Sequence, residues 1–383
     1  MKPSNKMRIA VLFGGRSAEH EVSVNSAANV IQFLDKSLFD VVPMGIDKQG
    51  NWFLGHDVFK KSMEQKTVPQ LHQQQEDATW FTPEWIGKPT TATQTVAAAS
   101  STSSPLFDVV FPVVHGTMCE DGTLQGLLEL ANLPYVGCGV LASAVGMDKD
   151  VSKRLAMHAN IPVAPYIVIK QNAWQKNTAY WLQHIAEKLS YPVFVKPANT
   201  GSSIGITKVK SADHLLFAIQ RAFRFDTKIL IEKALDIYEL EVAVLESLEP
   251  DGDPIVSVVG EIKSRHEFYS YEAKYIDEHG AELCIPAMIA AELTAKAQAV
   301  AKKIFTTLEC EGMARVDLFL EKNTQEIYFN EVNTIPGFTE ISMYPKLMAA
   351  SGVSYSDLLT HLVKLAIKRH KDKSRLERNY QQE

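Results

Sequence analysis

The chain has 383 residues, 46% of them hydrophobic, which is enough for two or three domains with cores of their own. Its 39 basic and 45 acidic residues give a formal net charge of −6, and this balance argues against non-specific binding of nucleic acid. Four cysteines without close spacing indicate neither a zinc site nor a disulfide framework, and no apolar run reaches the roughly 20 residues of a membrane span, so we expect a soluble cytoplasmic protein without membrane contact.

The first part of the chain alternates strands and helices. Residues 7–13 form a continuous apolar run that ends at two glycines, which predicts a buried parallel strand. The elements expected after it are a helix at 17–34, strands at 40–46 and 107–114, and a helix near 122–131. This order predicts a small α/β domain with a parallel sheet. Residues 56–105 are rich in Gln, Ser and Thr, and we expect a loop or a disordered insert there.

The rest of the chain predicts two further α+β blocks. The middle block is expected to contain helices at 148–160, 174–189 and 211–224 and strands at 166–170, 191–197, 206–210 and 228–233. The last block is expected to contain strands at 239–246, 254–263, 313–320 and 326–332, a long helix at 289–308 and a terminal helix from about Tyr355. We therefore divide the chain into an N-terminal domain (1–146), a central subdomain (147–238) and a C-terminal catalytic subdomain (239–383).

Two strands near the C-terminus carry a candidate metal site. Arg315 and Asp317 are two residues apart, as are Glu331 and Asn333, so each pair shares one face of its strand. If the strands pair, two carboxylates, an amide and a guanidinium converge on one patch. Hard oxygen ligands suit Mg²⁺, and an arginine can stabilise negative charge in a transition state. A surface ion-pair patch is the alternative, but apolar neighbours favour the metal site.

Two glycine-containing turns are candidate binding loops. The first follows the strand at 7–13 and precedes Glu19, a carboxylate that could hold a substrate ammonium. It does not match a dinucleotide-binding fingerprint, and a packing role is the alternative. The second follows Lys196 and reads ANTGSSIG, which suits phosphate binding although it is no Walker P-loop and could be a hairpin connection. Together with Lys149 and the metal patch, it favours a nucleotide site.

Two other segments are weaker candidates. The apolar strand at 229–235 could offer backbone hydrogen bonds to an adenine edge, with Glu239 in reach of a ribose hydroxyl. The polar stretch 264–282 contains Tyr269, Tyr271, Lys274 and Tyr275, and its length predicts a lid. Aromatic packing on the domain surface is the alternative reading of this stretch.

In combination and in this order, seven motifs resemble the D-alanine–D-alanine ligase family of the ATP-grasp superfamily. They are GGRSAEHEVS, HGTMCEDGTLQG, MDKDVSK, GSSIG after the Lys196 strand, FYSYEAKY, ARVD and NEVNTIPG. The resemblance spans the chain from Met7 to the terminal helix, apart from the segment 56–105. It implies a Rossmann-like N-terminal domain followed by a two-subdomain ATP-grasp fold, and a homodimer. It also implies that ATP drives ligation of two D-alanines through an acyl phosphate for peptidoglycan, with two Mg²⁺ ions, for which Mn²⁺ could substitute.

The resemblance assigns a role to each matching position. The implied substrate contacts are Glu19 and His115 for the first D-alanine, Arg315 for the oxyanion, and Gly337 and Ser342 for the second D-alanine. The implied ATP contacts are Lys149, Lys196, Ser203, Glu232, Lys233, Leu235, Glu239, Lys274 and Asn330. The implied metal ligands are Asp317, Glu331 and Asn333. Glu19, Ser202 and Tyr275 match a hydrogen-bonded set that acts with Arg315 in catalysis.

Two departures from the family pattern bear on these roles. The candidate phosphate loop reads Ala198-Asn199-Thr200-Gly201 where many relatives have Arg-Glu before the glycine. The strand with the candidate metal ligands reads Asn330-Glu331-Val332-Asn333 where many relatives have Glu-Ala-Asn. The ligating positions are intact. Tyr275 resembles the dipeptide-forming type. The alternatives are D-serine or D-lactate as acceptor, another ATP-grasp ligase, and a nucleotide-binding regulator without turnover.

Overall fold

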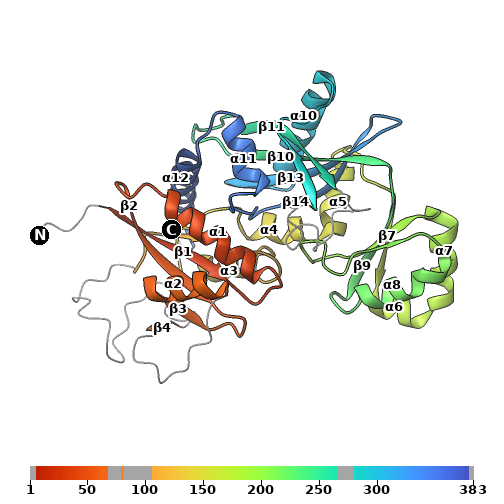
Figure 1. Ribbon diagram of the computed structural model, residues 1–383, viewed down its shortest axis with the longest axis horizontal. Coiled ribbons are helices and arrows are strands. Elements are labelled where there is room, and N and C mark those ends of the chain that lie inside the picture. Colours follow the sequence, from red (N-terminus) through yellow and green to blue (C-terminus); the bar gives the residue numbers. More distant parts are fainter. Residues whose placement is uncertain (1–5, 68–78, 82–105, 265–279, 379–383) are drawn as a thin grey trace, which may run out of the picture.

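The N-terminal domain is built on a mixed sheet. The structure is a computed structural model that describes residues 6–67, 79–81, 106–264 and 280–378 (Figure 1). Within these residues the first sheet has five strands in the order β4-β3-β2-β1-β5. Its strands are β1 (Met7–Gly14), β2 (Phe39–Ile46), β3 (Trp52–Leu54), β4 (Thr79–Phe81) and β5 (Val109–Pro112). The strands β1, β2 and β5 are parallel, as the sequence predicts, and β3 and β4 add an antiparallel edge.

Helices flank this sheet and close its core. They are α1 (His20–Phe33), α2 (His56–Gln65), α3 (Thr123–Leu130) and α4 (Val140–Met147). The apolar run in β1 is fully buried from Ile9 to Phe13, which explains why it lacks polar alternation. The chain turns at Gly14 and Gly15, whose φ angles of 90° and 97° favour glycine, and enters α1 at Glu19.

The expectation of a loop or disordered insert at 56–105 is wrong for part of that segment. Residues 56–65 form α2, which buries Val58 and Ser62, and residues 79–81 form β4, which pairs with β3. Only these two residues of α2 are buried, so the segment can carry many polar residues and still fold as a helix. The stretches 68–78 and 82–105 lie outside the described residues.

The central subdomain is an antiparallel sheet covered by helices. Its strand order is β6-β9-β7-β8 in the described chain, with β6 (Tyr166–Lys170), β7 (Val193–Pro197), β8 (Thr207–Val209) and β9 (Lys228–Lys233). Its helices are α6 (Gln171–Lys176), α7 (Thr178–Leu189), the 3₁₀ turn η2 (Ala212–His214) and α8 (Leu215–Ala222). The single helix expected at 174–189 is divided, because Asn177 accepts a hydrogen bond from the Tyr180 backbone and caps α7.

The C-terminal subdomain is a second antiparallel sheet. Its strand order is β12-β11-β10-β13-β14, with β10 (Ile237–Leu245), β11 (Ile255–Ser264), β12 (Ala281–Cys284), β13 (Met313–Glu321) and β14 (Ile327–Asn333). Its helices are α10 (Ala291–Thr307), α11 (Met343–Ala350) and α12 (Tyr355–Ser374). The helix α5 (Lys149–His158), expected in the middle block, packs here instead, with Ala156 in the same core as Val316. Ala297, Ala301 and Ile304 of α10 pack against Val242 and Val316, as its predicted apolar stripe requires.

One hydrophobic core is shared by the two ends of the chain. Ile9 and Val24 of the N-terminal domain lie in the same buried cluster as Leu347 of α11 and Leu358 of α12. Arg369 of α12 also lies over the Tyr135 ring, 4.4 Å from its centroid, and donates to backbone carbonyls beside it. The central subdomain has a separate core and lies at the opposite end of the molecule from the N-terminal domain (Figure 1). Across the described residues, no helix is long and apolar enough to cross a membrane.

Candidate active site

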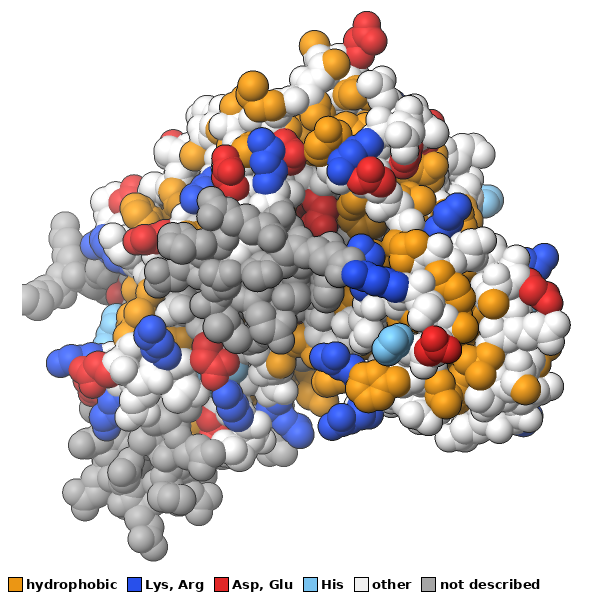
Figure 2. Space-filling model, turned by 45° about the vertical axis from the view of Figure 1, so that its right-hand side comes forward, with side chains coloured by type: hydrophobic (Ala, Val, Ile, Leu, Met, Phe, Trp, Pro, Cys, Tyr) orange, Lys and Arg blue, Asp and Glu red, His pale blue; other side chains and the backbone are white. Residues whose placement is uncertain are grey.

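A cleft lies between the central and the C-terminal sheets. Figure 2 shows an acidic side chain deep in a hollow with basic side chains near its edge. All the described residues that the resemblance assigns to ATP line this cleft: Lys149, Lys196, Ser203, Glu232, Lys233, Leu235, Glu239 and Asn330. Its apolar walls come from Phe194, Ile206, Ile237, Ile262, Leu318 and Phe319. A cleft with apolar walls and convergent charges suits a ligand with a flat apolar ring and an anionic tail.

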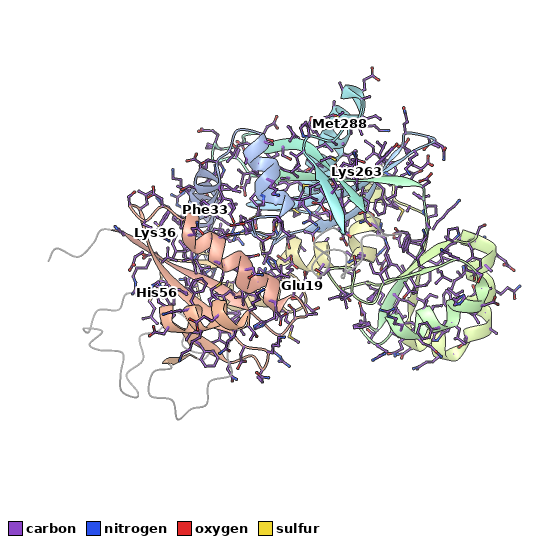
Figure 3. All side chains as sticks on the ribbon, viewed as in Figure 1. Glu19, Phe33, Lys36, His56, Lys263 and Met288 are labelled. Atoms are coloured by element: carbon purple, nitrogen blue, oxygen red, sulfur yellow. The ribbon has the colours of Figure 1, made fainter. Side chains whose placement is uncertain are left out.

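Glu19 lies at the end of the N-terminal domain that faces the middle of the molecule (Figure 3). It is only 7% exposed, and its Oε1 accepts a short hydrogen bond from Ser202 Oγ. Two glycines approach its other oxygen: a Cβ at Gly116 or Gly201 would lie 2.7 or 2.8 Å from Glu19 Oε2. The structure therefore brings together two members of the predicted set. The third, Tyr275, lies outside the described residues, as does Lys274, together with most of the predicted lid.

The two candidate phosphate lysines are buried and held in place. Lys149 Nζ donates to the Thr200 carbonyl at 2.8 Å and lies 3.1 Å from Glu331 Oε2. Lys196 Nζ lies 2.8 Å from Glu232 Oε1 and 5.7 Å from the centroid of the Phe319 ring. Both ammonium groups are therefore fixed by partners before any ligand binds, which reduces the reorganisation that binding requires.

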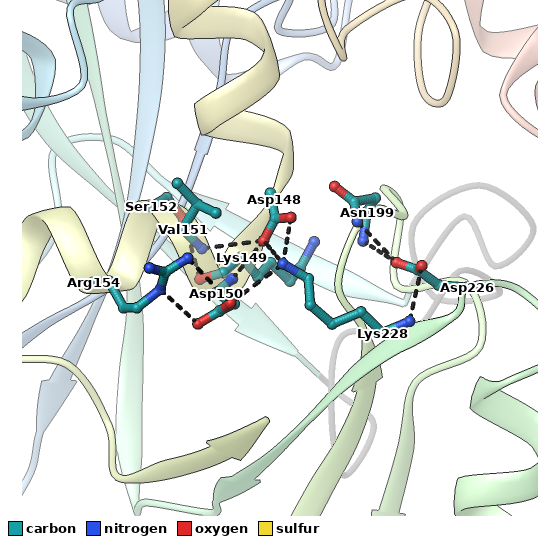
Figure 4. A network of polar contacts seen from close by, with 9 residues as sticks. All are labelled: Asp148, Lys149, Asp150, Val151, Ser152, Arg154, Asn199, Asp226 and Lys228. Carbon is teal, nitrogen blue, oxygen red and sulfur yellow. Dashed lines mark hydrogen bonds and ion pairs between the residues drawn. The ribbon is translucent and has the colours of Figure 1, made fainter. Parts of the chain in front are cut away.

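A polar network joins α5 to the loop of residues 198–205, the candidate phosphate loop (Figure 4). Asp148 caps α5 through the backbone of Asp150 and accepts from Lys228 Nζ at 2.7 Å. Asp226, two residues before Lys228, accepts from the Asn199 backbone at 2.7 Å and from its side-chain amide at 3.0 Å. Asn199 is one of the positions at which the sequence departs from the pattern of the family that it resembles, and these bonds anchor it in the loop.

The two strands that carry the candidate metal ligands, β13 and β14, pair as the sequence predicts. In the β13–β14 register Asp317 is opposite Glu331, and Arg315 is opposite Asn333. Asp317 accepts two hydrogen bonds from Arg315, at 2.7 and 2.8 Å, and one from Asn333 Nδ2 at 3.0 Å. Among the described residues, no group of three or more His, Cys, Asp or Glu side chains is arranged so that it could hold a metal ion by itself. Two carboxylates and an amide still fit Mg²⁺, because this ion takes its other ligands from water and phosphate oxygens.

Glu241 is a site residue that the sequence reasoning missed. Its Oε2 lies 2.9 Å from Arg315 Nε, and it is opposite Asp317 on the neighbouring strand β10. Burial opposes the charge on Arg315, but Asp317 and Glu241 outweigh it and raise the pKa of the guanidinium well above its usual value. Strand periodicity could have identified Glu241, because it lies two residues after the candidate residue Glu239 and so shares its strand face.

A second cluster surrounds His115, which is 3% exposed. Its Nδ1 lies 3.1 Å from the Ile335 carbonyl oxygen and its Nε2 3.1 Å from Ser26 Oγ. Burial lowers the pKa of His115 to about 4. The sequence reasoning also missed Glu120, which accepts from the Gly116 backbone at 2.7 Å and whose pKa is raised to about 8 by burial and by the charge of Glu19.

The residues assigned to the second D-alanine lie together in the loop before α11. Ser342 Oγ accepts from the Thr339 backbone at 2.9 Å, and a Cβ at Gly337 would lie 2.7 Å from the same oxygen. Ile335, two residues before Gly337, is the residue whose carbonyl contacts His115. This loop therefore connects the two candidate substrate positions.

Comparisons with known proteins point in one direction. The family model "D-ala D-ala ligase N-terminus" matches residues 8–138, and "D-ala D-ala ligase C-terminus" matches residues 155–364. A D-alanine–D-alanine ligase A of Bradyrhizobium diazoefficiens is 50% identical over 382 residues, which is 98% of this chain and 99% of the relative. A D-alanine–D-alanine ligase of Caldicellulosiruptor bescii is 46% identical over 370 residues, 96% and 97% of the two chains. Among solved structures, the VanG D-Ala:D-Ser ligase from Enterococcus faecalis superposes with a TM-score of 0.79 at 36% identity, covering 94% of this chain and all of that one.

Proposed function

The chain belongs to the D-alanine–D-alanine ligase family, and from that premise we propose that it uses ATP to join two D-alanines into the dipeptide D-alanyl-D-alanine, a precursor of peptidoglycan. The observation that carries the proposal is the single cleft in which two buried lysines lie close to the Asp317–Glu331 pair, with Glu19 joined to the loop that follows Lys196. This arrangement offers one region for polyphosphate and an adjacent region for an amino acid.

We assign the apolar part of the cleft to the adenine ring. Leu235, Ile237 and Phe319 provide apolar walls, and Glu239 lines the same cleft, where a ribose hydroxyl could donate to it. Lys149 and Lys196 are assigned to the phosphates, together with Ser203 in the glycine-containing loop. Glu331 and Glu232 pair with these two lysines and support the assignment. They hold each ammonium group in a fixed position in the cleft, away from bulk water.

Asp317, Glu331 and Asn333 would hold two Mg²⁺ ions, with Mn²⁺ as a substitute. When bound, the ions would neutralise phosphate charge and align the transferred group. Two of these side chains are engaged within the protein, Asp317 by Arg315 and Glu331 by Lys149. With a metal bound there, Lys149 would lose part of its pairing with Glu331 and be available to the substrate phosphates, while Glu241 would still hold Arg315.

In the first half-reaction, Glu19 holds the ammonium of the first D-alanine. A carboxylate oxygen of that substrate forms a bond to the γ-phosphorus, the bond to the β–γ bridging oxygen breaks, and ADP leaves with that electron pair. Lys149 and Lys196 stabilise the charge on the transferred group. The His115 ring is neutral at neutral pH, because burial lowers its pKa to about 4.

In the second half-reaction, Ser342 and the Gly337 backbone bind the carboxylate of the second D-alanine. Its neutral amine attacks the acyl carbon, and the tetrahedral intermediate carries a negative oxygen. Arg315 stabilises that oxygen. As the peptide bond forms, the C–O bond to phosphate breaks, and phosphate leaves with its electron pair and takes up the proton that the amine nitrogen loses. The ion pairs of Arg315 with Asp317 and Glu241 support this role, because they fix the guanidinium in one orientation.

The test is ADP release by the purified protein with ATP and Mg²⁺, with products identified by mass. D-alanine alone should give strong turnover and the dipeptide, whereas L-alanine should not. No ADP release with any amino acid would refute the proposal.

The VanG structure supports one alternative, with D-serine as the second substrate, because that relative is a D-Ala:D-Ser ligase. A competition between D-alanine, D-serine and D-lactate as acceptors separates the two. We favour D-alanine because relatives with higher identity, 50% and 46%, are D-alanine–D-alanine ligases. The proposal also includes a homodimer in the cytoplasm, which sedimentation of the purified protein and cell fractionation would test.

A further inference from the structure

Lys153 is a buried lysine that none of the roles above uses. It lies one helical turn after Lys149 on α5 and is 0% exposed. Its Nζ lies 3.0 Å from Glu232 Oε2 on β9 and donates to the Phe329 carbonyl oxygen on β14 at 3.3 Å. An ammonium without water is unfavourable unless charged and polar partners compensate for it. Lys153 therefore contacts one strand on each side of the cleft, β9 and β14. Both contacts compensate for the burial of its ammonium group.

Glu232 connects Lys153 to Lys196. The two oxygens of its carboxylate are divided between the two lysines: Oε2 contacts Lys153, and Oε1 lies 2.8 Å from Lys196 Nζ. Glu232 is itself 1% exposed. Burial raises the pKa of its carboxyl group, but the two lysines outweigh burial and lower it to about 2, so the carboxylate is charged at neutral pH.

The charges of this cluster matter for an anionic ligand. Burial lowers the pKa of Lys153, and the charge and hydrogen bond of Glu232 oppose that shift. With both lysines charged, two ammonium groups and one carboxylate sum to +1, so the carboxylate neutralises only part of the charge that Lys196 presents to the cleft. Without Lys153, a single lysine would face a single carboxylate, and the pair would be neutral. The Glu232 carboxylate would also be free to turn fully toward Lys196 and draw its ammonium away from the cleft.

We propose that Lys153 is a positioning residue for ATP, which holds the Glu232 carboxylate so that Lys196 stays oriented toward, and electrostatically available to, the phosphates of the nucleotide. Its bond to Phe329 fixes this unit against the strand that carries Asn330 and Glu331. The inference rests on the proposed function, since it takes the ligand of the cleft to be ATP.

The first test compares the kinetics of Lys153→Met with those of the wild type. We expect the KM for ATP to rise by about ten-fold or more while the KM for D-alanine stays within about two-fold. Lys296→Met is the matched control, because it removes a half-exposed lysine that pairs with Glu326 at 3.3 Å on the surface of the C-terminal subdomain. It should leave both KM values unchanged. Equal rises in both KM values for Lys153→Met would indicate a general structural defect and overturn the proposal.

The second test asks whether Lys153 acts through Glu232. In a Glu232→Gln background, adding Lys153→Met should change the KM for ATP by less than about two-fold, because the carboxylate that transmits the effect is gone. The same factor in both backgrounds would refute the proposal.

If Lys153→Met does not fold, Lys153→Gln serves instead, since it keeps a hydrogen-bond donor but removes the charge. Calorimetry should then show weaker ATP binding without any D-alanine, and unchanged affinity would refute the inference. A wild type that binds ATP but does not ligate D-alanine would refute the proposed function and leave this inference open to the same binding measurement.

Discussion

Acid should destabilise the folded protein through His115. Because a carbonyl oxygen only accepts hydrogen bonds, the Ile335 contact requires that Nδ1 carry the proton, and Nε2 then accepts from Ser26 Oγ. The folded protein therefore holds a neutral ring. Burial lowers its pKa from 6.5 to about 4, with the Ile335 bond opposing this shift and Arg315 adding to it.

The size and direction of the effect follow from proton linkage. The unfolded chain protonates this ring near pH 6.5 and the folded protein near pH 4. Between these values the unfolded state binds more protons, so the free energy of unfolding decreases as the pH falls. At about 1.4 kcal/mol for each pH unit, the loss approaches about 3 kcal/mol by pH 4. Stability from this residue is fully present above pH 6.5.

The assay is the denaturant midpoint of wild type and His115→Gln, measured without ligands from about pH 7.5 to about pH 4.5. The variant cannot titrate at this position, so the stability advantage of the wild type should shrink by about 2 kcal/mol or more as the pH falls. Contributions shared by both chains cancel in the difference. A difference between the two chains that stays constant with pH would refute the reasoning.

Three substitutions test other parts of the site. Glu331→Gln should lower kcat by about 100-fold or more at an unchanged melting temperature, and near-normal ADP release would remove this residue from the metal site. Ser202→Ala removes the hydrogen bond to Glu19 and should raise the KM for D-alanine by about ten-fold, with the KM for ATP as the internal control; equal changes in both would contradict the assignment. Gly116→Ala, at φ +81°, would bring a Cβ to 2.7 Å from Glu19 Oε2, so we expect loss of D-alanine binding and about 1–3 kcal/mol of destabilisation, whereas wild-type kinetics would speak against this packing.

Strand periodicity was sufficient to predict the centre of the candidate site. Residues two apart on β13 and β14 had to share a face, and the register places Asp317 opposite Glu331. The parallel sheet of the N-terminal domain could be predicted in the same way. The run from Ile9 to Phe13 is apolar at every position, as expected of a strand that is buried on both faces of its sheet. In both cases the signal is local and depends on one well-defined repeat.

Contacts between distant segments were not predictable in the same way. Lys153, Glu232 and Phe329 come from three elements that only the folded structure brings together, and a lone lysine on a helix normally reads as a solvated residue. The helix α2 was missed for a different reason. Its face toward the core is so narrow that its composition resembles that of a loop.

The core shared between the two ends of the chain has a consequence for synthesis on the ribosome. The N-terminal domain cannot complete its packing until Leu347 and Leu358, more than three hundred residues after Ile9, have left the exit tunnel. The hydrophobic core of the central subdomain consists of residues between Ile169 and Ile231, so this core can close earlier. The nascent chain therefore carries exposed apolar surface at its beginning while its middle is already folded, and during this interval chaperones are most needed.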